Sequence, residues 1–147
     1  MSEELKKRTK KFALDVIKLC SGLPQTLETR HAIGQVIRSS SSTAANYRSA
    51  CRAKSKADFI SKLGTVEEKA DESGFWLEML RDILQLRTTN DEFRMPVRGA
   101  KPELRQSQLD IRTLQELDRL EDEADQLVAI TVASKKTARG DHGPKSE

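Results

Sequence analysis

Two residues have the spacing of metal ligands in a helical protein. Glu28 and His31 form a Glu-x-x-His pair, which places a carboxylate and an imidazole on one face of a helix. A di-iron site in a helical bundle needs a second such pair and two further carboxylates. The other histidine, His142, lies near the C-terminus without a matching glutamate. The sequence therefore predicts no metal site and no cofactor.

Acidic residues cluster where acid–base chemistry could be sought, namely at Glu67, Glu68, Asp71 and Glu72. One interpretation is a solvated helix face. The alternative turns Glu68 or Glu72 inward, paired with Arg38 or with hydroxyl groups of a neighbouring helix, because a buried carboxylate needs such partners. The sequence has no glycine-rich phosphate loop, no Ser/His/Asp set and no Cys/His pair. We therefore expect no catalytic residues, and a protein that is not an enzyme.

The composition is that of amphipathic helices. Of the 147 residues, 36% are hydrophobic, 33% charged and 4% aromatic, which favours one all-α domain over a β-sandwich. Apolar residues recur every three or four positions between the prolines. We expect an antiparallel up-down-up-down four-helix bundle over 1–139. Its helices should span about 2–21, 27–51, 55–87 and 104–139, with a loop at 88–103 and a disordered tail at 140–147.

Seven consecutive small residues, at positions 39–45, lie within the second predicted helix. Serine and threonine are mediocre helix formers because their hydroxyls compete for the backbone. Tertiary packing must therefore hold the helix here, and small side chains let another helix approach closely. We predict that this segment packs on the third helix. Leucine at Ser41 or Ala44 should then lower stability by about 1–3 kcal/mol through overpacking.

The third predicted helix is apolar on more than one face. One stripe steps by three and four residues and comprises Phe59, Leu63, Val66, Ala70, Ser73, Leu77, Leu80 and Leu84. A second flank comprises Phe75, Trp76, Met79 and Ile83. A helix apolar on two faces usually buries both. The flank is either a subunit interface of a homo-oligomer or the edge of a wide core face.

The predicted topology gathers basic residues at one end of the bundle. The start of the first helix, the turn between the second and third, and the end of the fourth should meet there. They carry Lys6, Lys7, Arg8, Lys10, Lys11, Arg48, Arg52, Lys54, Lys56, Lys135, Lys136 and Arg139. Clustered cations are typical of surfaces that bind nucleic-acid phosphates. We therefore hypothesise RNA or DNA binding without base specificity, although charged helix ends alone would also give this pattern. A structural module or an adaptor for another protein is the alternative.

The remaining features favour a soluble cytoplasmic protein. The sequence begins without a signal peptide, and its most apolar stretch, 127–133, is too short to span a membrane. Cys20 and Cys51 should lie at opposite ends of the bundle, roughly 27 Å apart at 1.5 Å per helical residue. This separation excludes an intrachain disulfide, so both are predicted to be packing residues.

Several segments carry a family resemblance, namely 35–39, 45–48, 50–56, 59, 69–73, 75–80, 123–130 and 132–138. They resemble the bacterial four-helix-bundle proteins related to those encoded in intervening sequences of 23S rRNA genes. The resemblance implies an antiparallel bundle that assembles into rings, pentamers in particular. It extends distantly to the accessory variability determinant of diversity-generating retroelements, a basic pentameric bundle that works with a reverse transcriptase and nucleic acid. It implies fold and assembly but little about function.

Overall fold

The computed structural model describes residues 2–93 and 111–140, and this part of the chain contains four α-helices and no strand. The helices are α1 (Ser2–Ser21), α2 (Leu27–Ala50), α3 (Lys56–Phe93) and α4 (Ile111–Arg139). The predicted all-α, four-helix fold is confirmed.

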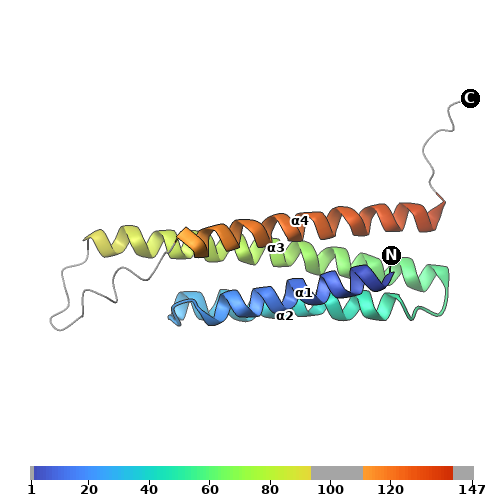
Figure 1. The fold of residues 1–147 in the computed structure, drawn as a ribbon, viewed down its shortest axis with the longest axis horizontal. Coiled ribbons are helices and arrows are strands. Elements are labelled where there is room, and N and C mark those ends of the chain that lie inside the picture. The colour runs from blue at the N-terminus through green and yellow to red at the C-terminus, as the bar shows by residue number, and fades with distance from the viewer. Residues whose placement is uncertain (1, 94–110, 141–147) are drawn as a thin grey trace, which may run out of the picture.

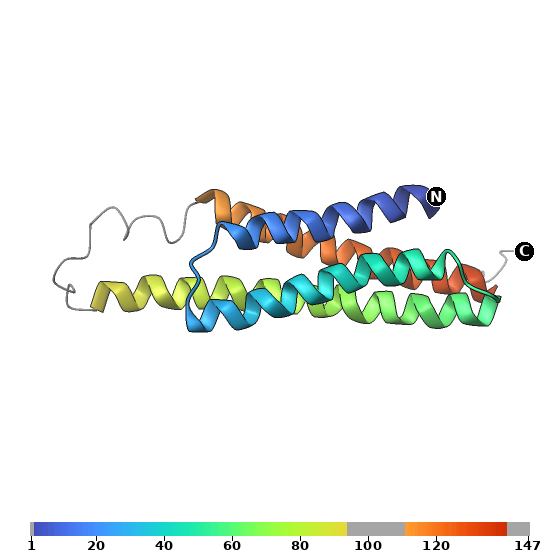
Figure 2. The same ribbon diagram turned by 90° about the horizontal axis from the view of Figure 1, so that it is seen from below.

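The helix α3 is longer than its sequence pattern indicated. It continues to Phe93, past the expected end near 87, so the first part of the predicted loop is helical. Figures 1 and 2 both show α3 extending beyond the other helices at that end of the bundle. The rest of the predicted loop, the expected start of the last helix near 104 and the tail from 141 onward lie outside the described residues.

Each helix runs opposite to the one before it, as the colours in Figure 1 show. Extensive contacts join α3 to both α2 and α4, α2 packs on α1, and the contact between α1 and α4 is the smallest. In the view of Figure 1, α1 and α2 form one side of the bundle, and α3 and α4 form the other. Consecutive helices are therefore neighbours around one core.

Side-chain hydrogen bonds cap the N-terminal ends of α2 and α3. The Thr26 hydroxyl accepts a hydrogen bond from the backbone N–H of Thr29, and the Thr29 hydroxyl accepts one from the N–H of Thr26, which together form a capping box. At the start of α3, the N–H of Asp58 donates to the Ser55 hydroxyl at 3.1 Å. These side chains satisfy backbone donors that have no partner within the helix.

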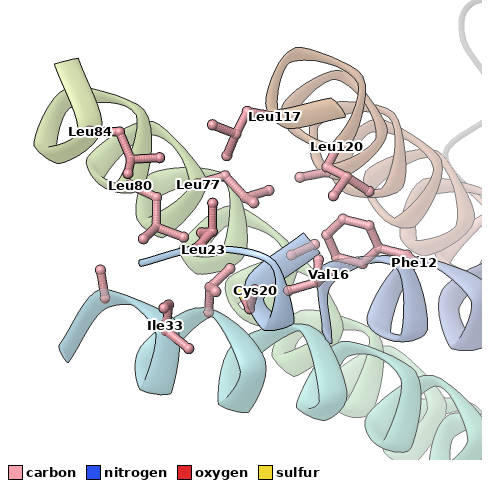
Figure 3. Close-up of a cluster of buried hydrophobic side chains, with 14 of the residues drawn as sticks. Phe12, Val16, Cys20, Leu23, Ile33, Leu77, Leu80, Leu84, Leu117 and Leu120 are labelled. Carbon is pink, nitrogen blue, oxygen red and sulfur yellow. The ribbon is translucent and has the colours of Figure 1, made fainter. Parts of the chain in front are cut away.

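Leucines from α3 and α4 dominate the main core (Figure 3). In Figure 3, Leu77 points toward Leu117 and Leu120 and Leu80 points toward Leu23, and the four leucines of α3 and α4 are fully buried. The aromatic ring of Phe12 enters the same core from α1. A smaller cluster lies toward the other end of the bundle and comprises Tyr47, Ala50, Leu63 and Val66. Every position of the predicted α3 stripe is buried except Phe59, which is half-buried.

The small-residue segment 39–45 packs on α3, as predicted. Ser39 and Ser73 are both fully buried, and their hydroxyl oxygens share a hydrogen bond of 3.0 Å. The Thr43 hydroxyl donates to the Ser39 carbonyl at 2.9 Å, so this buried polar group is also satisfied. Close approach of α2 to α3 therefore depends on small side chains at these positions.

Two details of the segment differ from the prediction. Ser41 is exposed and lines a groove with residues of α1, so leucine there should not overpack the core. The proposed link from Glu72 to the serines is also wrong, because Glu72 accepts a hydrogen bond from Lys69 on its own helix at 3.0 Å. Glu68 is exposed. The acidic cluster therefore follows the solvated-face interpretation at Glu68 and Glu72.

Candidate nucleic-acid interface

The bundle brings four helix termini to one end. Figures 1 and 2 show the end of α2, the start of α3 and the end of α4 there, with the start of α1 set slightly back. Lys10 and Lys11 occupy the middle of α1 and therefore lie along the side of the bundle. The twelve candidate cations are thus spread over an end and an adjoining side, and not concentrated at the end alone.

Four of the twelve candidates are held in ion pairs. Arg8 donates to both carboxylate oxygens of Glu123, at 2.7 and 2.9 Å, and this hydrogen bond raises the pKa of the Arg8 guanidinium. The other three pairs are Lys6 with Glu3, Lys11 with Asp15, and Lys135 with Glu67. A cation already paired with a carboxylate has less to gain from a phosphate.

The other eight candidates are exposed and make no ion pair with any carboxylate that the structure describes. Four lie on the turn between α2 and α3, at the first residue of α3, or on α4; we call them the end cations, and they are Lys54, Lys56, Lys136 and Arg139. The other four, the groove cations, are Lys7, Lys10, Arg48 and Arg52. The two groups have different surroundings.

A groove of about 650 Å³ runs between α1 and the C-terminal half of α2. Near the bundle end its walls carry the four groove cations together with the paired Lys6 and Glu3. Farther along, its lining is apolar or small, and consists of Ala13, Leu14, Ile17, Ser41, Ala44 and Ala45. We call this surface the α1/α2 groove; it combines positive charge with exposed aliphatic side chains.

The opposite side of the bundle is acidic. A hollow of about 320 Å³ between α3 and α4 is lined by Gly74, Phe75 and four carboxylates, namely Asp71, Glu78, Glu121 and Asp125. A Cβ at Gly74 would lie 3.6 Å from the Cβ of Ala124, which is an ordinary van der Waals contact. We call this surface the acidic face.

The carboxylates of the acidic face differ in their partners. Glu121 forms an ion pair with Arg81, with 2.9 Å between nitrogen and oxygen, whereas the other three make no ion pair with a described cation. Burial raises the pKa of the Glu121 carboxyl above its usual range, and the charges of Asp118 and Glu78 act in the same direction, against Arg81. Negative charge is therefore in excess on this face.

The candidate interface residues on α3 have unequal exposure. Trp76 and Ile83 are half-buried and pack against the main core, and Met79 is half-buried. Phe75 is 52% exposed and touches Trp76 edge to face, with ring centroids 5.0 Å apart. Packing within one subunit thus accounts for part of the second apolar flank, and Phe75 is its main exposed member.

The residues considered for metal or thiol chemistry have structural surroundings. His31 packs edge to face against Trp76 at 5.3 Å, and no group of three potential metal ligands comes together among the described residues. Cys20 and Cys51 are free thiols, and burial raises the pKa of Cys20 to about 12. No helix within the described ranges is long and apolar enough to cross a membrane.

Sequence reasoning missed the acidic face and the α1/α2 groove. Glu121 and Asp125 are distant in sequence from Asp71 and Glu78, and only the pairing of α3 with α4 brings them together. Their spacing of four residues places them on one side of α4, which was the available signal. The sequence pattern alone did not indicate which helix lies beside that face of α4.

Comparisons with known proteins agree with this architecture. The family model described as 23S rRNA-intervening sequence protein matches residues 2–95. A crystal structure of a protein with unknown function from the S23 ribosomal protein family of Bacteroides thetaiotaomicron has a similar fold, with a TM-score of 0.59 and 21% sequence identity. The match covers 89% of this chain and 97% of that one. No curated protein sequence matches the chain. The distant relation to the accessory variability determinant stays an expectation.

Proposed function

The chain belongs to the 23S rRNA-intervening sequence protein family, and we propose that it is a non-enzymatic, self-associating bundle that binds nucleic-acid phosphates through its end cations. The observation that carries the proposal is the absence of ion pairs at Lys54, Lys56, Lys136 and Arg139 within the described part of the chain. Four exposed cations at one end would release condensed counterions on meeting a phosphate backbone.

The surroundings of the end cations favour binding without base specificity. Sequence-specific recognition of single-stranded RNA typically stacks unpaired bases on aromatic side chains or arginine planes and hydrogen-bonds their edges. Tyr47, the aromatic residue closest in sequence to the α2–α3 turn on the α2 side, is 6% exposed and belongs to the smaller core cluster. Phe59 is half-buried against the same cluster. The end therefore offers charge to a backbone and little aromatic surface to a base.

Self-association would strengthen such binding. Each added subunit contributes another set of end cations, so the charge available to one nucleic acid grows with the number of subunits. The exposed Phe75 supports a contact between subunits, because large aromatic side chains are enriched at interfaces. A ring of five subunits is the assembly that the family resemblance implies.

A second candidate function is that of a structural or protein-partner adaptor. Lys136 and Arg139 lie in the last turn of α4, where cations stabilise the helix dipole without any ligand. Under this alternative, the end cations serve the helix termini and solubility only. The cytoplasm is the compartment we propose in either case.

Gel shifts at rising salt separate the two candidates. We expect the protein to retard a single-stranded RNA and a duplex DNA of unrelated sequences at about 50 mM salt, and to release both as salt increases. Retardation that depends strongly on sequence would contradict the non-specific mode. No retardation even near about 50 mM salt would contradict nucleic-acid binding and leave the adaptor function.

A further inference from the structure

A hollow of about 440 Å³ lies at the same end of the bundle as the end cations. Its walls come from the end of α2, the α2–α3 turn and the start of α3, whose positions Figure 2 shows, and Ser2 of α1 completes the lining. Tyr47 and Ala50 are buried in it, whereas Ala53 and Phe59 are half-buried. We call this surface the terminal hollow; small-molecule sites commonly have volumes of about 300–1,000 Å³, so its size suits a ligand.

The terminal hollow combines an apolar lining with positive charge. Lys56 belongs both to its lining and to the end cations, and Lys54 lies two residues away on the adjoining turn. Neither lysine makes an ion pair with a described carboxylate, and no carboxylate stands among the lining residues of the hollow. A ligand that fills the hollow and reaches both lysines must therefore bring apolar surface together with negative charge.

An unpaired nucleotide has both of these properties. Its base has flat apolar faces, and its phosphate is an anion. The bases of a duplex are stacked and paired, so one of them could enter the hollow only after extrusion, which costs free energy. A free phosphate would leave the apolar lining uncovered.

We propose that the terminal hollow takes one unpaired base of a single-stranded nucleic acid while Lys54 and Lys56 contact the flanking phosphates. The inference rests on the phosphate binding of the proposed function and adds a preference for single strands over duplexes. The hollow accepts any base, because its lining has no amide or carboxylate side chain that would read a base edge. Burial holds the base, and only the half-buried ring of Phe59 adds a face for stacking.

The thiol of Cys51 reports directly on the hollow. Cys51 is a half-buried free cysteine of the lining, so a base in the hollow should shield it from iodoacetamide. With a single-stranded RNA at about ten times its Kd, the rate of Cys51 alkylation should fall about tenfold, because only the empty fraction reacts. A duplex at about ten times its own Kd should leave the rate within about twofold of the free protein, because its paired bases stay outside. Cys20, which is 2% exposed, is the reference in the same sample, since its alkylation would indicate unfolding.

A matched pair of leucine substitutions tests the hollow independently of the thiol. Ala53→Leu fills the hollow, whereas Ala57→Leu places the same side chain at an exposed position of α3 outside the lining. In gel shifts, Ala53→Leu should weaken the binding of single-stranded RNA about tenfold and leave duplex binding unchanged, because one base loses its site. Ala57→Leu should change neither affinity. Circular dichroism checks that both variants keep the helical spectrum of the wild type.

The outcomes separate this inference from the proposed function. Equal shielding of Cys51 by single strand and duplex would overturn the base site and leave phosphate binding by the end cations in place. Wild-type RNA affinity in a folded Ala53→Leu variant would do the same. If neither nucleic acid binds near about 50 mM salt, the proposed function fails, and the base site fails with it.

Discussion

The two sides of the bundle use the same architecture to present opposite charges. Between α1 and α2 lies a groove with five cations and one carboxylate, and between α3 and α4 lies a hollow with four carboxylates and no cation among its lining residues. The formal net charge of +3 conceals this separation. A small net charge therefore says little about the partners of a protein whose charges are sorted by side.

The two sides also differ in how their charges are satisfied. Arg81 on α3 pairs with both Asp118 and Glu121 of α4, which reduces but does not cancel the negative charge there. On the other side, Lys6 pairs with Glu3 and Arg8 pairs with Glu123. The four groove cations make no ion pair with a carboxylate in the described structure. Excess charge of opposite sign on two surfaces is what intermolecular pairing can use.

The leucine core that supports both sides of the bundle should dominate its stability. Leu77→Ala should lower the free energy of unfolding by about 2–5 kcal/mol, because a fully buried leucine leaves a cavity between α3 and α4. Leu86, which is 62% exposed, is the matched control, and Leu86→Ala should change stability by less than about 0.5 kcal/mol. Urea denaturation gives both values. Equal effects of the two substitutions would contradict a shared leucine core.

Leucine substitutions along the small-residue segment should separate the packed side of α2 from its groove side. Ser39→Leu should destabilise by about 1–3 kcal/mol, because the buried serine touches Ser73 across the α2–α3 contact. Ser41→Leu should leave the thermal midpoint nearly unchanged, since Ser41 is exposed and lines the groove. A reversed order of the two effects would mean that α2 is rotated relative to its assigned face.

A paired and an unpaired cation on α1 should behave differently. Arg8→Gln should cost about 1 kcal/mol of unfolding free energy, because it removes a bidentate pair that ties α1 to Glu123 of α4. Lys7→Gln should cost less than about 0.5 kcal/mol, since Lys7 is exposed and makes no described ion pair. Thermal unfolding of the two variants side by side provides the comparison. A larger loss of unfolding free energy for Lys7→Gln than for Arg8→Gln would contradict the stabilising role of the Arg8–Glu123 pair.

Acid should affect two carboxylates of α4 in opposite directions. The hydrogen bond from Arg119 lowers the pKa of Glu116, so its contribution to stability is present above the usual carboxyl pKa and is lost as pH falls through the lowered value. Burial raises the pKa of Glu121, so the folded protein gains stability as pH falls through that raised value. At pH 7, Glu116→Gln should therefore destabilise by less than about 1 kcal/mol, and Glu121→Gln should not. Both differences from the wild type should shrink toward pH 3, as measured by urea denaturation; a constant difference across pH would contradict the assignment.

The fold was predictable because its determinants are local and periodic. Apolar steps of three and four residues located Leu77, Leu80 and Leu84, which are all buried in the main core. The end of α3 was misplaced because residues beyond 87 lack an apolar stripe that marks where a helix stops. The seven small residues also predicted correctly that α2 packs on α3. They did not predict the rotation of α2 about its axis, which buries Ser39 and exposes Ser41.

The candidate site was less predictable because pairing depends on contacts distant in sequence. Composition identified the basic residues, and topology placed the end cations. It could not show that Arg8 meets Glu123, or that Lys135 meets Glu67. These pairs arise only when α1 and α3 are set against α4 with a particular rotation. Sequence therefore identified the charges, and the structure decided which of them are available to a ligand.

The salt dependence of RNA binding tests the central claim most directly. One variant neutralises the end cations by Lys54→Gln, Lys56→Gln, Lys136→Gln and Arg139→Gln. A control of equal charge neutralises four paired lysines by Lys6→Gln, Lys11→Gln, Lys62→Gln and Lys69→Gln. If the end cations contact phosphates, the slope of log Kobs against log salt should fall in magnitude by about 3 in the first variant and change little in the control. Equal slopes in the two variants would show that net charge, and not the end of the bundle, determines binding.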